Sequence, residues 1–376
     1  MLNVFAHYET CLEYMAQRLR PEDQPEFHVL RTRLMENLSH ARLYGETPTR
    51  QSDRSMVLDR LNTLALSALG TTFDAVAKTT RPRGAPSSVD VIVYVALGEE
   101  FSVALKHFGK GFVPEEMDDI AVTVYQGTVR SGDPESNCKV LIVPAGTMGN
   151  TRSSSLVSAF LAKSEARNVV ALGIAGSIGD DLQPGDVFIP QSVNEYMANA
   201  AATGSETLSF IPSGNRLPID PRLLNRAQFF HANNPARRRD WTRRANGKWK
   251  SLVSAAMLGR LKRAGIELRG YSKVVSGEDR ILGSGPAVSK GVAFARWIRE
   301  AARKTEAVEM ESAGVLDAAF IRTPAPRALV IRGISDYGDS RKKIIEVATK
   351  GSFRELAIAN ATAYLTSAIR SGLFCS

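Results

Sequence analysis

The chain has 376 residues, of which 44% are hydrophobic and 23% charged, and its formal net charge is +9. This composition is typical of a globular protein and excludes a disordered, collagen-like or coiled-coil chain. No apolar stretch approaches the roughly 20 residues of a membrane span, and residues 1–20 lack the apolar core of a signal peptide. Cys11, Cys138 and Cys375 lie far apart without metal-ligand spacing. We expect a cytoplasmic protein with no membrane association, no metal ion and no cofactor.

The N-terminal part, residues 1–77, is predicted to be a small all-helical domain. Apolar residues recur at helical spacing over Val4–Leu19, Pro25–Gly45 and Gln51–Ala68, and glycines follow the second and third segments as stop signals. Residues 78–88 (KTTRPRGAPSS) are rich in Pro, Ser, Thr and Arg and have no periodicity, which predicts a linker.

Residues 89–376 alternate between strand and helix patterns, which predicts one larger domain. Val89–Leu97 and Lys139–Pro144 are nearly continuous apolar runs, as expected of strands covered on both faces. Further strands are predicted at 120–130, 169–173, 186–190, 272–276 and 328–335, and helices at 154–163, 252–264, 287–304, 311–320 and 353–369. This pattern predicts an α/β fold with a mixed, mostly parallel central sheet flanked by helices.

Ligand sites in such a sheet form at the carboxyl ends of the strands. Five segments follow predicted strands and are therefore candidates, at 98–100, 145–150, 173–179, 276–280 and 335–339. The segment Gly173–Gly179 predicts a glycine-rich turn whose backbone amides can approach a ligand. It is not a dinucleotide-binding fingerprint, because Ala175 occupies the third position of the GxGxxG pattern, where glycine is required, and no acidic residue ends a following strand.

Two carboxylates, Glu311 where a short strand meets a helix and Asp336 at the end of a buried strand, have more than one possible role. Glu311 can accept hydrogen bonds from the vicinal hydroxyls of a ribose, or it can cap the helix that begins there. Asp336 can act as a general acid, or it can cap a helix or form a turn.

A basic cluster between residues 237 and 250 accounts for much of the excess positive charge. It can hold phosphates, nucleic acid or an acidic partner, or it can be a solvated loop. No RNA-recognition aromatic pair, zinc finger or leucine zipper accompanies it, so nucleic acid is not the expected partner. The basic residues of this cluster are Arg237, Arg238, Arg239, Arg243, Arg244, Lys248 and Lys250.

Five segments, in this order, resemble the purine nucleoside phosphorylase and nucleosidase superfamily. They are ALGEEF (96–101), GIAGSIGDDLQPGDVFIP (173–190), SGEDRI (276–281), AVEMESAG (307–314) and IRGISDYGD (331–339). No single segment is specific, but the ordered set is, and it covers the chain from residue 89 onward. The resemblance implies cleavage of the N-glycosidic bond of a purine nucleoside or nucleotide.

The resemblance assigns opposite tasks to two carboxylates. Asp336 matches the acid that protonates N7 of the purine, and Glu100 matches the glutamate that deprotonates the attacking water. Glu311 matches the residue that holds the ribose hydroxyls, and Met310 matches the residue beneath the sugar. Cleavage through an oxocarbenium-like transition state with a poor leaving group needs one acid on the side of the base and one general base on the side of the water. The remaining residues expected to bind substrate are Ala175, Gly176, Ser276, Arg280 and Ile281.

The nucleophile is expected to be water. Bacterial phosphorylases of this superfamily hold phosphate with an arginine and a serine around the glycine-rich segment and an arginine on the first loop. Ala171 and Ile174 occupy the first two positions here, and Gly98-Glu99-Glu100 occupies the loop. An apolar pair and two carboxylates disfavour phosphate.

Two departures from the nucleosidases of methylthioadenosine favour a substrate that carries phosphates. Arg280 stands where those enzymes carry a phenylalanine on the adenine, and an arginine can stack on a purine or contact a charged ligand. The segment 195–271 is long and basic, and Arg341, Lys342 and Lys343 follow Asp336. The ISDYGDS-plus-basic run most closely resembles phosphorylase-like modules of fungal and bacterial immune receptors, some of which hydrolyse ATP to adenine and ribose triphosphate.

The leading hypothesis is therefore an adenine-nucleotide N-glycosidase that acts in defence. Residues 31–76 resemble helical effector-associated adaptors, which implies recruitment to a protein activator, and the superfamily resemblance implies a homo-oligomer. The alternatives are a salvage nucleosidase or phosphorylase acting on nucleosides, methylthioadenosine or adenosylhomocysteine, a catalytically silent nucleotide sensor, and a nucleic-acid binder. The number of phosphates, the sugar and the identity of the purine stay open.

Overall fold

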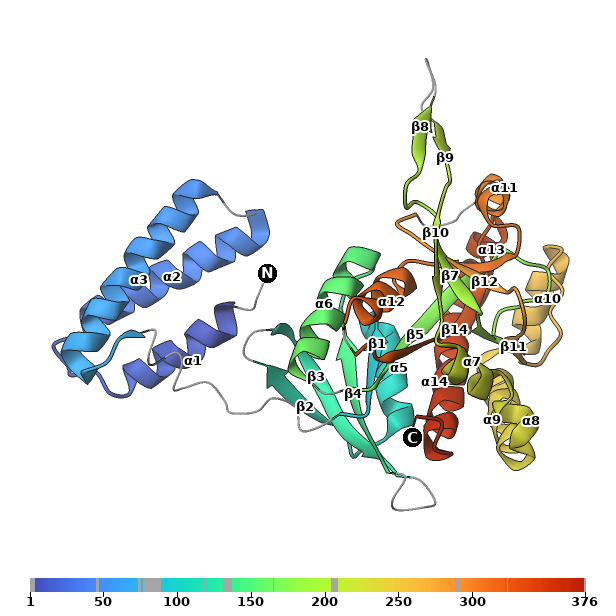
Figure 1. Ribbon diagram of the computed structural model, residues 1–376, viewed down its shortest axis with the longest axis horizontal. Helices are drawn as coiled ribbons and strands as arrows, with labels where there is room; N and C mark the ends of the chain where they lie inside the picture. Colours follow the sequence, from blue (N-terminus) through green and yellow to red (C-terminus); the bar gives the residue numbers. More distant parts are fainter. Residues whose placement is uncertain are drawn as a thin grey trace. The chain divides into compact units, whose positions relative to one another are not determined.

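The computed structural model places two compact units, residues 1–85 with 116–123 and residues 86–115 with 124–376 (Figure 1). The predicted linker at 78–88 lies outside the described residues, so the domain boundaries at 77 and 89 stay predictions. Among the described residues, no helix is long and apolar enough to span a bilayer. The described residues are 4–44, 47–73, 76, 89–117, 120–130, 137–164, 166–203, 209–287, 291–322 and 324–374.

The first unit contains the three predicted helices. They are α1 (Val4–Ala16), α2 (Gln24–Tyr44) and α3 (Pro48–Leu69). The sequence marks both ends of α3, because Thr47 accepts a hydrogen bond from the amide of Arg50 and Gly70 adopts a left-handed conformation at φ 67°.

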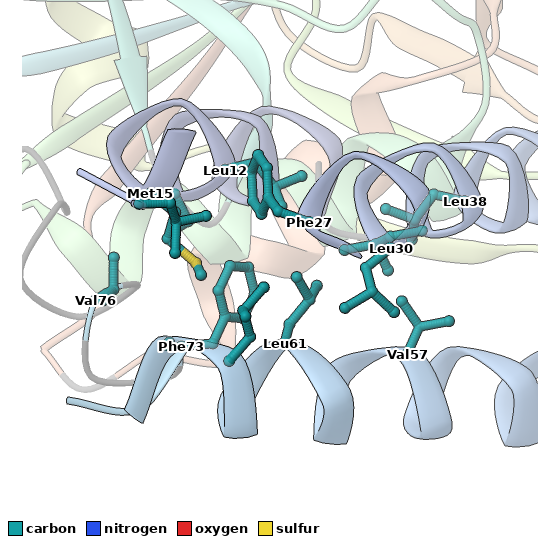
Figure 2. Close-up of a cluster of buried hydrophobic side chains, with 14 residues drawn as sticks. Leu12, Met15, Phe27, Leu30, Leu38, Val57, Leu61, Phe73 and Val76 are labelled. Carbon is teal, nitrogen blue, oxygen red and sulfur yellow. The ribbon is translucent and has the colours of Figure 1, made fainter. Parts of the chain in front are cut away.

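A buried apolar cluster holds these helices together. Figure 2 shows Leu12 and Met15 of α1 and Phe27 and Leu30 of α2 pointing toward Leu61 of α3. Isolated helices of this length are only marginally stable in water. Burying one such side chain stabilises the fold by roughly 1.5–3 kcal/mol, so the shared cluster stabilises the three helices together.

The second unit is built on a mixed sheet. Its central strands are β1 (Val91–Val95), β4 (Cys138–Pro144), β5 (Asn168–Ser177) and β14 (Arg327–Tyr337), which run parallel to one another. Every residue of β1 is buried, as predicted for a strand covered on both faces. The strand order is β10-β7-β12-β13-β5-β1-β4-β3-β2, and β14 pairs with both β5 and β6. The other strands are β2 (Val113–Met117), β3 (Ile120–Val129), β6 (Val187–Ile189), β7 (Ser192–Glu195), β10 (Asn215–Pro218), β11 (Val274–Ser276), β12 (Ile281–Ser284) and β13 (Thr305–Glu309), with a separate hairpin of β8 (Ala201–Thr203) and β9 (Ser209–Ile211).

Helices cover this sheet, which confirms the predicted α/β class with a helical N-terminal part. In the second unit, α6 packs against α12, α14 packs against α5 and α9, and both α12 and α14 contact β5 and β14. The helices are α5 (Gly98–Phe108), α6 (Asn150–Lys163), α7 (Pro221–Gln228), α8 (Phe230–Asn233), α9 (Pro235–Leu252), α10 (Ala255–Arg263), α11 (Val292–Ala301), α12 (Ser312–Phe320), α13 (Arg341–Thr349) and α14 (Ser352–Arg370).

Two segments differ from their sequence interpretations. The basic cluster at 237–250 is not a loop but lies in α9, because Trp241, Ala245 and Trp249 recur every four residues and are buried. The indole of Trp241 donates a 3.1 Å hydrogen bond to the carbonyl of Asn360 in α14. The glycine-rich segment 173–179, predicted as a turn, forms mostly the second half of β5, where the absence of side chains allows close approach of β14.

Candidate active site

A cavity of about 100 Å³ lies where β1, β5, β13 and β14 end. Six of the nine predicted site residues line it. They come from strand ends or strand–helix junctions, as expected for a sheet of this kind. The six residues are Glu100, Ala175, Gly176, Met310, Glu311 and Asp336.

The other three predicted residues, Ser276, Arg280 and Ile281, are not among the residues that line this cavity. Arg280 instead pairs within its own chain, with Nη2 at 3.0 Å from Asp181 and Nη1 at 3.6 Å from Glu306. Its side chain is only 24% exposed. The expected contact of these three residues with substrate stays a prediction.

Asp336 lies near the end of β14, where the pairing with β5 shifts register between Ile334 and Asp336. Its carboxyl is 4% exposed, and Oδ2 accepts a 2.6 Å hydrogen bond from the hydroxyl of Ser335. Among the described residues, Oδ1 has no hydrogen-bond partner. Burial raises the pKa of Asp336, although Lys342 and Ser335 oppose that rise. A raised pKa favours the protonated form, which is the form that a general acid needs.

Glu100 lies in the first turn of α5, directly after β1, and is 4% exposed. Its Oε2 also lacks a hydrogen-bond partner among the described residues. Burial raises the pKa of Glu100 to about 7, while Arg332 and Arg354 act in the opposite direction. A carboxylate with a pKa near the working pH is well matched to the task of a general base.

Glu309 and Glu311 divide the two roles that the sequence left open for Glu311. The carboxylate of Glu309 accepts hydrogen bonds from the amides of Glu311 and Ser312, at 3.0–3.1 Å, and so caps α12. The side chain of Glu311 makes no such cap and faces the cavity. Burial, together with the adjacent Glu309, raises the pKa of Glu311 to about 8.

Arg332 is a residue to which the sequence motifs assigned no role. It lies in β14, is 1% exposed, and forms an ion pair with Glu309. Its Nη2 lies 3.7 Å from Glu311 and donates a 2.8 Å hydrogen bond to Ser312. A buried arginine must be paired. The arginine inside the apolar run ALVIRGIS was therefore a signal that a buried acidic partner exists.

Arg332 and Glu100 both pack closely against Gly173 of β5. A Cβ atom on Gly173 would overlap Nη1 of Arg332 and would lie 3.1 Å from Oε2 of Glu100. In the same strand, a Cβ on Gly176 would lie 3.0 Å from Oδ1 of Asp336. The glycines of β5 therefore let the carboxyl groups of Glu100 and Asp336 and the guanidinium of Arg332 approach the strand backbone.

Two cations, Lys342 and Arg354, complete the charged part of the lining. Lys342 comes from the basic run after Asp336, whereas Arg354, in the first turn of α14, carried no sequence signal. The neighbouring Arg341 is held away by Asp339, with Nη2 at 2.7 Å from Oδ2, and its guanidinium covers the ring of Tyr337.

Comparisons with known proteins agree with this architecture. The family model described as "Phosphorylase superfamily" matches residues 90–370. Two curated relatives from Escherichia coli, one of them from strain KTE188, are each called "ATP nucleosidase Cap17". Each is 24% identical over 295 residues, which are 76% of this chain and 52% of the relative. The chain thus spans about half the length of the curated relatives it matches.

Solved structures show the same fold. Futalosine hydrolase of Helicobacter pylori is 17% identical, with a TM-score of 0.51, and the match covers 75% of this chain and 98% of that one. The 5′-methylthioadenosine/S-adenosylhomocysteine nucleosidase of Helicobacter pylori is 17% identical, with a TM-score of 0.52, and the match covers 76% and 100%. Since the family model spans most of the chain, this protein belongs to the phosphorylase superfamily.

Proposed function

We propose that this protein hydrolyses the N-glycosidic bond of a purine nucleotide, with ATP as the expected substrate, and releases free base and ribose phosphate. One observation carries the proposal. Glu100 and Asp336 are buried, line one cavity, and each carries an oxygen without a hydrogen-bond partner among the described residues. Two carboxyl groups that flank one cavity can supply the acid and the base that glycoside hydrolysis requires.

The two groups would act in opposite directions. Protonated Asp336 donates its proton to N7 of the purine as the bond between the sugar and the base breaks, so the base leaves neutral. Ionised Glu100 accepts a proton from water, whose oxygen bonds to C1′ of the sugar. Glu311 binds the sugar hydroxyls, and Arg332, paired with Glu309, holds the buried carboxylates in place.

The cavity lining favours water over phosphate as the nucleophile. Ile174 lines the cavity, and Ala171 is buried in β5 at a position where phosphorylases carry an arginine. Glu100 adds negative charge when it is ionised. Phosphate would have to displace water from an apolar and acidic wall, which is unfavourable.

A nucleotide is the proposed substrate class because Lys342 and Arg354 line the cavity and can contact phosphate oxygens. The name of the curated Escherichia coli relatives, ATP nucleosidase, supports the same choice. The resemblance to immune modules supports a role as a defence effector. A nucleoside of purine salvage is the alternative substrate.

Three further expectations belong to this proposal: a homo-oligomer, a cytoplasmic location, and a protein activator that binds the N-terminal helices. Val29 of α2 and Met56 and Leu66 of α3 are more than half exposed, which supports helix–helix contact with a partner.

Chromatography of ATP, AMP, adenosine and methylthioadenosine, incubated with and without phosphate, tests the proposal. We expect free adenine from ATP, independent of phosphate, and a loss of about 10²-fold or more in Asp336→Asn. Adenine from the uncharged nucleosides alone would indicate a salvage enzyme. Release that depends on phosphate would overturn hydrolysis. Nucleotide binding in calorimetry without release of base would indicate a sensor.

A further inference from the structure

A second cavity, of about 460 Å³, adjoins the candidate active site. The two cavities share Glu100 and Arg354 in their linings, so they meet at these side chains. The second cavity lies among α5, α9 and the turn between α13 and α14, all within the second unit. A ligand that extends beyond the smaller catalytic cavity past Arg354 would enter this space.

The lining of the second cavity carries four cations and three carboxylates, Glu99, Glu100 and Glu355. Its cations are Lys106, Lys248, Lys350 and Arg354. Two of them are already paired with carboxylates of the lining, Arg354 Nε at 2.8 Å from Glu99 and Lys248 Nζ at 2.6 Å from Glu355.

Lys106 and Lys350 are different, because both are exposed and neither forms an ion pair with the residues that the structure describes. His107, in the last turn of α5, also lies near positive charge. Burial first, and then Lys248 and Arg244, lower its pKa, so the imidazole is neutral near pH 7 and adds no charge of its own. Two unpaired ammonium groups at one cavity favour an anionic ligand.

The backbone at this cavity also favours an anion. Gly351, which lines the cavity, precedes the first residue of α14 and has a φ of 83°. No side chain caps this helix start, and α14 extends over 19 residues. The amides and the dipole at such a helix start favour negative charge. Lys350, with a φ of 49°, belongs to the same turn and also lines the cavity.

We propose that this second cavity is the phosphate-binding subsite of the enzyme: the purine and sugar occupy the catalytic cavity, and the phosphate chain passes Arg354 toward Lys106 and Lys350. The inference rests on the proposed function and names the site that selects nucleotides over nucleosides. Arg354 lies at the boundary between the two cavities, because it lines both. A free triphosphate has the same chemistry as the phosphate chain, so a test must separate the two.

The experiment compares the double variant Lys106→Met/Lys350→Met with Lys110→Met in the full chain. Lys110 is an exposed lysine just beyond the end of α5 and is not part of the cavity lining, so it controls for loss of charge. We expect kcat/KM for ATP, relative to kcat/KM for adenosine, to fall by about tenfold or more in the double variant, since two charge-assisted contacts are lost. Lys110→Met should keep the wild-type ratio.

Inhibition and calorimetry with inorganic triphosphate form the second arm. We expect triphosphate to compete with ATP and to bind the double variant at least tenfold more weakly than the wild type. An unchanged ATP-to-adenosine ratio, or triphosphate that binds without competing with ATP, would overturn the inference. If no substrate releases base, the proposed function fails, but loss of triphosphate binding in the double variant would still support an anion site here.

Discussion

The ammonium group of Lys342 lies 3.7 Å from Oδ1 of Asp336, the carboxyl oxygen that lacks a hydrogen-bond partner among the described residues. Lys342 is the second residue of α13, so the helix that follows β14 brings a positive charge to the proposed acid. Burial raises the pKa of Asp336, and Lys342 opposes that rise. Burial and Lys342 therefore have opposite effects on the pH at which Asp336 loses its proton.

Replacing Lys342 should extend activity to higher pH. In Lys342→Met, the opposing charge is gone, so the pKa of Asp336 rises and the alkaline limb of kcat/KM moves upward. The pH dependence of kcat/KM measures this shift. Lys343→Met is the matched control, because Lys343 is exposed and does not line the cavity. Identical alkaline limbs in the two variants would contradict the assignment of Asp336 as the acid.

The acidic limb should report Glu100. A base must be ionised, and burial places the pKa of Glu100 at about 7, so kcat/KM should rise as the pH increases through about 7. Glu100→Gln should abolish this limb and lower kcat by roughly 10²–10⁴-fold. A pH–rate profile of both proteins decides the question. A variant that keeps the limb and the wild-type rate would show that another group activates the water.

The buried carboxyl groups should also make the protein less stable at high pH. The pKa of Glu100 is about 7 in the folded chain against 4.5 ordinarily, so between these values the folded state binds more protons than the unfolded state. The free energy of unfolding therefore falls as the pH rises through that range. Glu100→Gln removes this cost and should stabilise the protein by about 3 kcal/mol more at pH 9 than at pH 4. Urea denaturation at the two pH values measures the difference, and an equal effect at both would refute it.

The sequence was informative where a local pattern carries the information. Nearly continuous apolar runs such as 89–97 and 139–144 predicted the strands of the sheet centre, because both faces of such a strand are buried and most of its side chains are apolar. The strand ends then located Glu100 and Asp336, since the carboxyl ends of parallel strands share one edge.

Features that depend on contacts between distant segments were not predictable from local pattern. Arg332 meets Glu309 and Glu311 across the fold, and Arg354 reaches the cavity from a helix start far along the chain. The helix that carries the basic cluster was also missed. Trp241 and Trp249 lie among many charged residues, so the helical repeat of the buried positions is hard to see in the sequence. This helix is stabilised by packing against α14, which is distant in the sequence.

The glycine-rich strand β5 gives the last prediction. A Cβ on Gly173 would overlap Nη1 of Arg332, a side chain that is 1% exposed and tied to Glu309 and Ser312. Arg332 cannot withdraw into solvent, so the added methyl must displace it or the strand backbone, as overpacking does elsewhere at a cost of about 1–3 kcal/mol.

Gly173→Ala should therefore lower the free energy of unfolding by about 1–3 kcal/mol and reduce kcat for every substrate, because Arg332 and Glu100 both pack against this glycine. The matched control is Gly247→Ala in α9, where a Cβ meets nothing within 4 Å. That variant should gain roughly 0.5–1 kcal/mol, since alanine loses less backbone entropy than glycine in a helix. Chemical denaturation and turnover of both variants provide the comparison. If Gly173→Ala kept wild-type stability and kcat, the close packing of Arg332 and of Glu100 against Gly173 would not matter for holding the site.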